Sequence, residues 1–162
     1  MNKIIAYTSI EQIVVGDYRF NCNEYNFFDN EVTAREDIED FKEDNELTYV
    51  AKVEIIDKLF NIYNPIHRRQ LLSTLPVLVE INNKEIHREV LVISLMGNIY
   101  KDDYTLVSNE DDNSTFELFN NSQLKDIIKH LGFNGYVSMI EGLSQYTVFN
   151  PDKYVKILNL FL

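Results

Sequence analysis

The stretch from Ser122 to Ile157 decides the fold, and it reads SQLKDIIKHLGFNGYVSMIEGLSQYTVFNPDKYVKI. Apolar residues recur at helical spacing over Ser122–Leu131, where Asn121 or Ser122 can cap the helix and Gly132 can end it. Three β-prone runs follow, and they cover Tyr136–Ile140, Gln145–Phe149 and Tyr154–Leu158. This stretch therefore predicts a helix followed by three strands, with Pro151 in the last turn.

Working outward, the rest of the chain also predicts more strands than helices. Strands are expected at Lys3–Ser9, Tyr18–Phe20, Leu47–Ile56, Pro76–Ile81, Lys84–Leu95, Tyr100–Ser108 and Thr115–Phe119. Helical segments are expected at Ile10–Val15, Glu31–Glu43 and Pro65–Leu72, with Asp29 or Asn30 as the cap of the acidic one. No strict alternation of strand and helix occurs. The pattern therefore predicts an α+β fold with a mostly antiparallel, split β-sheet core and two or three helices.

Length and composition suit one domain that spans all 162 residues, of which 45% are hydrophobic. The only cysteine, Cys22, cannot form an internal disulfide, and a buried structural thiol is its simplest interpretation. The first residues do not form a signal peptide, and no apolar run approaches the ~20 residues that a membrane-spanning helix needs. We therefore expect a soluble protein of the cytoplasm, which would be the host cytoplasm for a phage protein.

The chain is strongly acidic, with a formal net charge of −11. Nucleic acid and anionic membranes should repel such a protein, so direct binding to either is not expected. The charge has two interpretations. It can simply keep the protein soluble, or it can provide an acidic surface that docks on a basic partner such as a nucleic-acid-binding complex.

Several common chemistries have no motif in this sequence. No phosphate-binding Walker loop, dinucleotide-binding glycine pattern or Gly-x-Ser-x-Gly elbow occurs. The three histidines, His67, His87 and His130, do not have the spacing of metal ligands, so no metal site is expected.

The C-terminal stretch resembles the ending of ADP-ribosyltransferase-like domains of bacteria and phages. The matching residues are Gly132-Phe133-Asn134-Gly135 after the helix, Gln145-Tyr146-Thr147-Val148-Phe149 as a strand, and Asn150-Pro151 before a closing strand with Ile157. The resemblance covers about 35 residues. It implies that the two strands flank a groove of nucleotide size, that NAD is the cofactor, and that the groove opens beside Gln145.

The resemblance also implies the site residues. Gln145 takes the place that a catalytic Glu usually holds in the family, and Glu141 lies in the loop before it. Tyr7, Thr8 and Ser9 take the place of the His-Gly-(Ser/Thr) triplet that binds the ribose next to nicotinamide, with Tyr7 in place of the His and Thr8 in place of the Gly. Tyr49 or Tyr25 would supply a ring that stacks on nicotinamide. Arg19, Arg68, Arg69 and Arg88 are candidates for the pyrophosphate.

Each of these residues also has a purely structural interpretation. Glu141 can be an exposed loop acid, Ser9 a turn residue at a strand end, and Tyr7 part of the core. The family's carboxylate stabilises an oxocarbenium-like sugar, and the neutral amide of Gln145 should do so less well.

Three functions follow from the resemblance and the charge. The first is an NAD-dependent ADP-ribosyltransferase-like effector that modifies a host protein. The second is a catalytically inactive acidic protein on the same fold that binds and inhibits a partner, such as a phage-encoded inhibitor of a host defence complex. The third is a domain that binds NAD or a related nucleotide without transferring anything.

Overall fold

The computed structural model describes residues 3–10, 20, 24–39, 49–56, 58–81, 83–96, 98–100, 106–108, 119, 121–140 and 142–161. The chain forms two compact units. Unit 1 takes both ends of the chain, Met1–Lys58 and Ser144–Leu162, and unit 2 takes Leu59–Leu143. Helices and strands occur in both units, so the predicted α+β class is confirmed. No helix of the described residues is long and apolar enough to cross a membrane.

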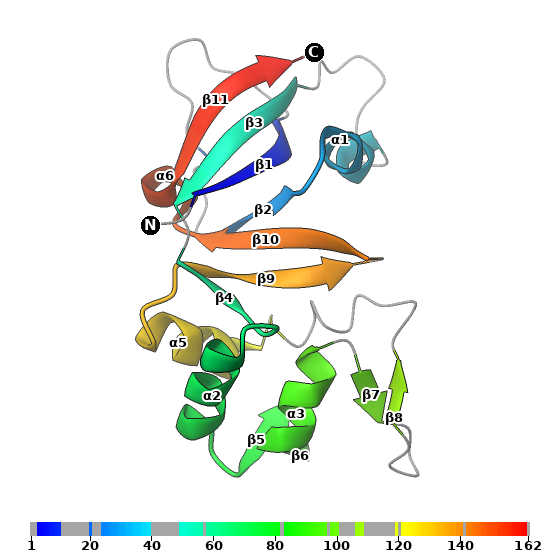
Figure 1. The fold of residues 1–162 in the computed structure, drawn as a ribbon, viewed down its shortest axis with the longest axis vertical. Helices are drawn as coiled ribbons and strands as arrows, with labels where there is room; N and C mark the ends of the chain where they lie inside the picture. The colour runs from blue at the N-terminus through cyan, green and yellow to red at the C-terminus, as the bar shows by residue number, and fades with distance from the viewer. Residues whose placement is uncertain are drawn as a thin grey trace. The chain divides into compact units, whose positions relative to one another are not determined.

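Unit 1 is built on five strands that lie side by side in the order β11-β3-β1-β2-β10 (Figure 1). Their bounds are Lys3–Ile10 for β1, Glu24–Phe28 for β2, Tyr49–Ile56 for β3, Leu143–Phe149 for β10 and Val155–Phe161 for β11. Every neighbouring pair is antiparallel, as the sequence predicted for most of the sheet. Because β10 pairs with β2 and β11 with β3, the two ends of the chain form a single sheet in unit 1.

Alternating side chains give this sheet two faces. On β3, Ala51, Val53 and Ile55 are fully buried and share one face of the strand. Ala6, which pairs with Val53, is on the same face, which we call the Val53 face. The opposite face carries Tyr7, Ser9, Phe28, Val50, Gln145 and Thr147 by the register of the strands, and we call it the Tyr7 face.

Helix α1 (Glu31–Glu39) follows β2 and packs on the Tyr7 face. The Asn30 side chain caps its first turn, since Oδ1 accepts hydrogen bonds from the backbone N of Thr33 (2.8 Å) and from its hydroxyl (3.0 Å). Ala34 is fully buried and forms a cluster with Phe28 and Val50, against which Tyr7 packs. The predicted acidic helix is therefore confirmed from Glu31 to Glu39, with Asn30 as its cap.

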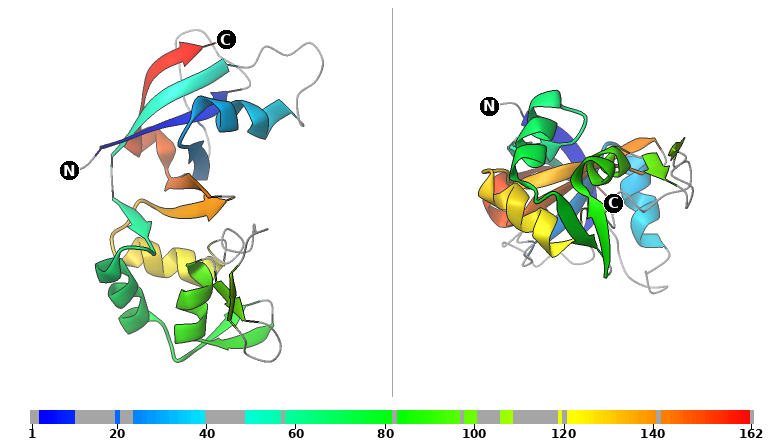
Figure 2. Two further views of the ribbon diagram at one scale, coloured as in Figure 1. Left: turned by 45° about the vertical axis from the view of Figure 1, so that its right-hand side comes forward. Right: turned by 90° about the horizontal axis from the view of Figure 1, so that it is seen from below.

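Among the described residues, unit 2 contains short strands and three helices of eight or more residues. Its elements are β4 (Leu59–Asn61), α2 (Pro65–Thr74), β5 (Leu78–Ile81), β6 (Lys84–His87), α3 (Arg88–Leu95), β7 (Asn98–Tyr100), β8 (Leu106–Ser108), α5 (Ser122–His130) and β9 (Gly135–Ile140). Helix α2 contacts both α3 and α5, and two further views show this arrangement (Figure 2). Strands β4 and β9 are parallel, whereas β5–β6 and β7–β8 are antiparallel pairs.

The helix predicted over Ser122–Leu131 is confirmed as α5. The Asn121 side chain accepts hydrogen bonds from the backbone N of Gln123 (3.0 Å) and of Leu124 (3.2 Å), so it is the cap. Gly132 follows the helix with φ of 92°, a conformation that glycine adopts without strain. Leu124 and Ile128 are fully buried, which places the predicted apolar stripe in the core.

The prediction of a strand over Lys84–Leu95 is wrong in its second half. The hairpin does form, with Asn83 at φ of 64° between β5 and β6, but residues from Arg88 onward form helix α3. Leu91, Val92 and Leu95 are its buried residues, and this spacing follows one face of a helix. The β-branched residues of this segment favour a strand in isolation. Burial of Leu91, Val92 and Leu95 within unit 2 overrides that preference.

The turn predicted at Pro151 is a short helix, α6 (Pro151–Tyr154), which starts after Asn150 at φ of 52°. With α3 and α6, the described residues contain five helices of four or more residues, more than the two or three expected. Several predictions fall outside the described residues: the helical turn after Ile10, most of Tyr18–Phe20, the buried thiol of Cys22, the end of the acidic helix, residues 101–105 and residues 115–118. Phe119 is helical, so the strand predicted to end there is wrong at this residue.

Candidate functional site

Tyr7, Phe28 and Gln145 form one row across three neighbouring strands of unit 1. Phe28 on β2 pairs with Tyr7 of β1 on one side and with Gln145 of β10 on the other. Directly paired residues on antiparallel strands point to the same face, so all three side chains belong to the Tyr7 face. Neighbouring strands lie about 4.8 Å apart, which separates Tyr7 from Gln145 by roughly 10 Å. The register thus aligns two site residues that lie far apart in the sequence.

Ser9 is also on the Tyr7 face, and its hydroxyl is engaged within the protein. It is buried, and its Oγ donates a hydrogen bond to the carbonyl of Ala34 in α1. The Tyr25 hydroxyl in turn donates to the Ser9 carbonyl over 2.9 Å. Ser9 therefore ties β1 to α1 and to β2, and it does so from within β1, where it pairs with Val50, and not from a turn as the sequence suggested.

Gln145 is the buried polar residue of β10 at the end of this row. Its exposed fraction is 6%, and its amide is not among the fully buried side-chain atoms that lack a hydrogen-bond partner in the described part of the chain. Its amide carries both a donor and an acceptor, which a ribose hydroxyl can match.

Asp29 holds the two residues on either side of Gln145. Its Oδ2 accepts a hydrogen bond from the backbone N of Ser144 (3.1 Å), and its Oδ1 accepts one from the hydroxyl of Tyr146 (2.5 Å). Sequence reasoning considered Asp29 only as a possible helix cap. No local pattern could have identified this role, because the partners lie 115 and 117 positions away in the chain.

Thr147 and Asn26, the pair two residues along from Gln145 and Phe28, form a polar contact on the same face. Thr147 is fully buried, and its hydroxyl donates to Oδ1 of Asn26 over 2.8 Å. Asn26 also accepts a hydrogen bond from the Thr8 hydroxyl through its backbone carbonyl (3.0 Å). These bonds tie β1, β2 and β10 together, so the row rests on a firmly connected part of the sheet.

Three other site residues predicted from the sequence, Thr8, Tyr49 and Tyr25, do not join this row. Thr8 and Tyr49 belong to the Val53 face by register, since Thr8 pairs with Ala51 and Tyr49 is two residues from Ala51. Tyr25 also points to that face, where its ring packs on Phe27 with centroids 5.4 Å apart. Arg19 and Glu141 lie outside the described residues.

Two of the arginines considered for the pyrophosphate, Arg68 in α2 and Arg88 in α3, make hydrogen bonds within the protein. Arg68 donates to the carbonyls of Ile62 (3.1 Å) and Tyr63 (3.3 Å), and Arg88 donates to the carbonyl of Leu75 (3.3 Å). His67 is half-buried and stacks on Phe60 with ring centroids 5.8 Å apart. Arg69 is exposed.

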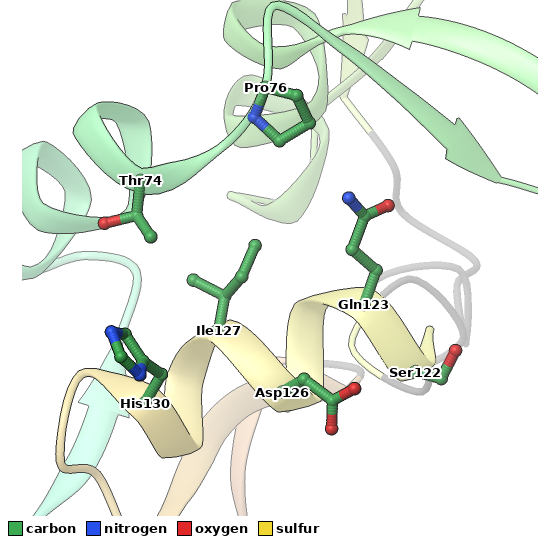
Figure 3. Close-up of a pocket in the computed structure, with 7 residues that line it drawn as sticks. All are labelled: Thr74, Pro76, Ser122, Gln123, Asp126, Ile127 and His130. Atoms are coloured by element: carbon green, nitrogen blue, oxygen red, sulfur yellow. The ribbon is translucent and has the colours of Figure 1, made fainter.

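Unit 2 also contains a shallow groove between the end of α2 and helix α5 (Figure 3). Ile127 points from α5 into the groove toward Thr74 and Pro76, as the close-up shows. The other lining residues are Ser122, Gln123, Asp126 and His130. Asp126 and His130 lie one helical turn apart, and no group of three or more potential metal ligands occurs among the described residues.

Comparisons with protein-family models, with curated proteins and with solved structures found no match for this chain.

Proposed function

We propose that this chain is an ADP-ribosyltransferase-like domain that binds NAD on the Tyr7 face of unit 1 and transfers ADP-ribose to a protein of the host. The observation that carries the proposal is the row of Tyr7, Phe28 and Gln145 across β1, β2 and β10. The sequence resemblance, which does not depend on strand pairing, also implies Tyr7 at the ribose and Gln145 at the catalytic position.

The row provides complementary chemistry for a nucleotide. Tyr7 is half-buried and aromatic, so its ring can pack against a flat heterocycle or a sugar face, whereas Phe28 is buried in the cluster with Ala34 of α1. The Gln145 amide can donate to one ribose hydroxyl and accept from another.

NAD supplies a sugar whose bond to nicotinamide breaks with the electron pair leaving on nicotinamide, while a nucleophile of the target protein bonds to the same carbon. Gln145 can orient the ribose through its hydroxyls, but its neutral amide cannot balance the positive charge that develops on the sugar. We therefore expect slow transfer compared with an enzyme that has a carboxylate there.

Label transfer from NAD marked in its adenylate, measured on a host lysate, tests this proposal. Wild-type protein should label a band, Gln145→Ala should lower the labelling by about tenfold or more, and Gln123→Ala should leave it unchanged. Gln123 is a matched control because it is an exposed glutamine in unit 2. If the wild type neither labels a band nor binds NAD in calorimetry, the proposal is refuted. If it binds NAD without labelling a band, it is a nucleotide-binding domain.

The hydrogen bonds that the Ser9 and Thr8 hydroxyls make within the protein favour a second function. Ser9 and Thr8 donate their hydroxyl hydrogens to backbone carbonyls rather than offering them to a ligand, and Gln145 carries no charge. Together with the net charge of −11, these observations support a protein that has lost transfer and binds a basic partner, such as a nucleic-acid-binding defence complex.

Capture of partners from the host lysate at increasing salt separates the two functions. An acidic binding protein should retain a basic partner at low salt and release it as the ionic strength rises. Its binding should survive Gln145→Ala. Loss of the partner's capture with Gln145→Ala, together with labelling by the wild type, would instead favour transfer.

A further inference from the structure

The carboxylate of Asp29 binds both neighbours of Gln145 at once. One oxygen accepts from the backbone of Ser144 and the other from the hydroxyl of Tyr146, so Gln145 is held from both sides along β10. The hydroxyl contact, at 2.5 Å, lies at the short end of the range for a hydroxyl bonded to a carboxylate.

This arrangement replaces the end of a strand ladder. Gln145 and Phe28 are the last paired residues of β10 and β2, and beyond Phe28 the chain turns into α1 (Figure 1). At that point the backbone of β2 no longer runs beside Ser144, whose backbone N donates to Oδ2 of Asp29. The side chain of Asp29 takes over as acceptor while its backbone leaves the sheet.

We infer that Asp29 is the positioning residue that holds Gln145 in place for ligand contact. This inference rests on the proposed function, because it assigns Asp29 a role at the same site. Asp29 is exposed, and its two bonds go to β10 rather than to α1, where Asn30 provides the cap. A carboxylate is needed, since only it offers two acceptor oxygens with no donor.

The test compares substitutions of Asp29 with a matched aspartate. Asp152 also accepts a backbone hydrogen bond in unit 1, from Phe20 over 2.7 Å, so Asp152→Ala removes a comparable contact elsewhere. Asp29→Ala should raise the Kd for NAD by about tenfold, and Asp29→Glu should restore part of it. Asp152→Ala should leave the Kd within about twofold of wild type.

Hydrogen exchange of the free protein gives a readout that does not depend on NAD. Asp29→Ala should speed exchange of the Ser144 amide by about tenfold, whereas Asp152→Ala should not change it. Asp29→Leu has a side chain of similar shape and no acceptor, so it serves if Asp29→Ala does not fold, and it should also speed exchange.

The possible results decide the inference and the proposed function separately. If the wild type binds no NAD, the proposed function fails. If Asp29→Ala leaves the exchange rate of the Ser144 amide unchanged, the positioning role of Asp29 is overturned. If the wild type binds NAD and Asp29→Ala binds it equally well, the proposed function stands and the role of Asp29 is refuted.

Discussion

The hydroxyl of Tyr146 donates a hydrogen bond of 2.5 Å to the carboxylate of Asp29, which joins β10 to the point where β2 ends. This contact connects residues that neither local sequence nor strand alternation would have paired. Its partly exposed position limits its energy, because water competes for both groups.

Tyr146→Phe removes this bond and leaves the ring in place. We expect it to lower the free energy of unfolding by about 1 kcal/mol, measured by urea denaturation. Tyr154→Phe is the control, since the contact of its ring with Lys153, at 5.2 Å from the ring centroid, does not need the hydroxyl. Equal losses in the two variants would contradict a specific role for the Tyr146 hydroxyl.

Thr147 and Ser138 offer a matched test of buried hydroxyls. Thr147→Val should cost about 1 kcal/mol, because it removes the bond to Asn26. Ser138 is fully buried, and its hydroxyl has no hydrogen-bond partner among the described residues. Ser138→Ala should therefore be neutral or stabilising by up to about 1 kcal/mol. Thermal melts of both variants measure these changes in stability. A marked loss of stability in Ser138→Ala would show that the Ser138 hydroxyl is hydrogen-bonded.

Gln145→Glu restores the carboxylate that the family resemblance expects. If transfer occurs at this site, the substitution should raise the rate of NAD cleavage by about 10²-fold, measured as nicotinamide release. It should also destabilise the fold by about 2 kcal/mol or more, because position 145 is only 6% exposed. Gln123→Glu, on the surface of unit 2, controls for added charge. No cleavage by any variant would favour the acidic binding protein.

Asn121 should contribute more to the free energy of unfolding than Ser122, the neighbouring polar residue at the start of α5. Asn121→Ala removes the acceptor for two backbone N–H groups and should lower the free energy of unfolding by about 1 kcal/mol. Ser122→Ala, at an exposed position that does not cap the helix, should change it by less than about 0.5 kcal/mol. A larger loss for Ser122→Ala would move the cap by one residue.

Tyr63 should make stability depend on alkaline pH. Burial raises the pKa of Tyr63 above its usual 10.0, so the folded chain keeps this proton at pH values where the unfolded chain has lost it. The stability that results is fully present below pH 10.0 and is lost as the pH rises through the raised pKa. The fall in unfolding free energy above this pH should be smaller in Tyr63→Phe. Parallel curves for the two proteins would contradict the prediction.

The elements with strong local signals could be predicted from the sequence. Helix α5 has its cap at Asn121 and its stop at Gly132, and β3 has clear alternation, so residues close in the chain specify both. Helix α3 was missed because its β-branched residues favour a strand in isolation, and only their burial in unit 2 selects the helix.

The candidate site divides in the same way. The sequence by itself determined the acidic character, the α+β class and the identities of Tyr7, Ser9 and Gln145 as polar or aromatic residues in strands. Only the tertiary structure decided that Tyr7 and Gln145 flank Phe28, that Ser9 bonds to α1, and that Asp29 holds β10. The physical reason is that strand register and side-chain pairing join residues far apart in the chain, which local propensity does not encode.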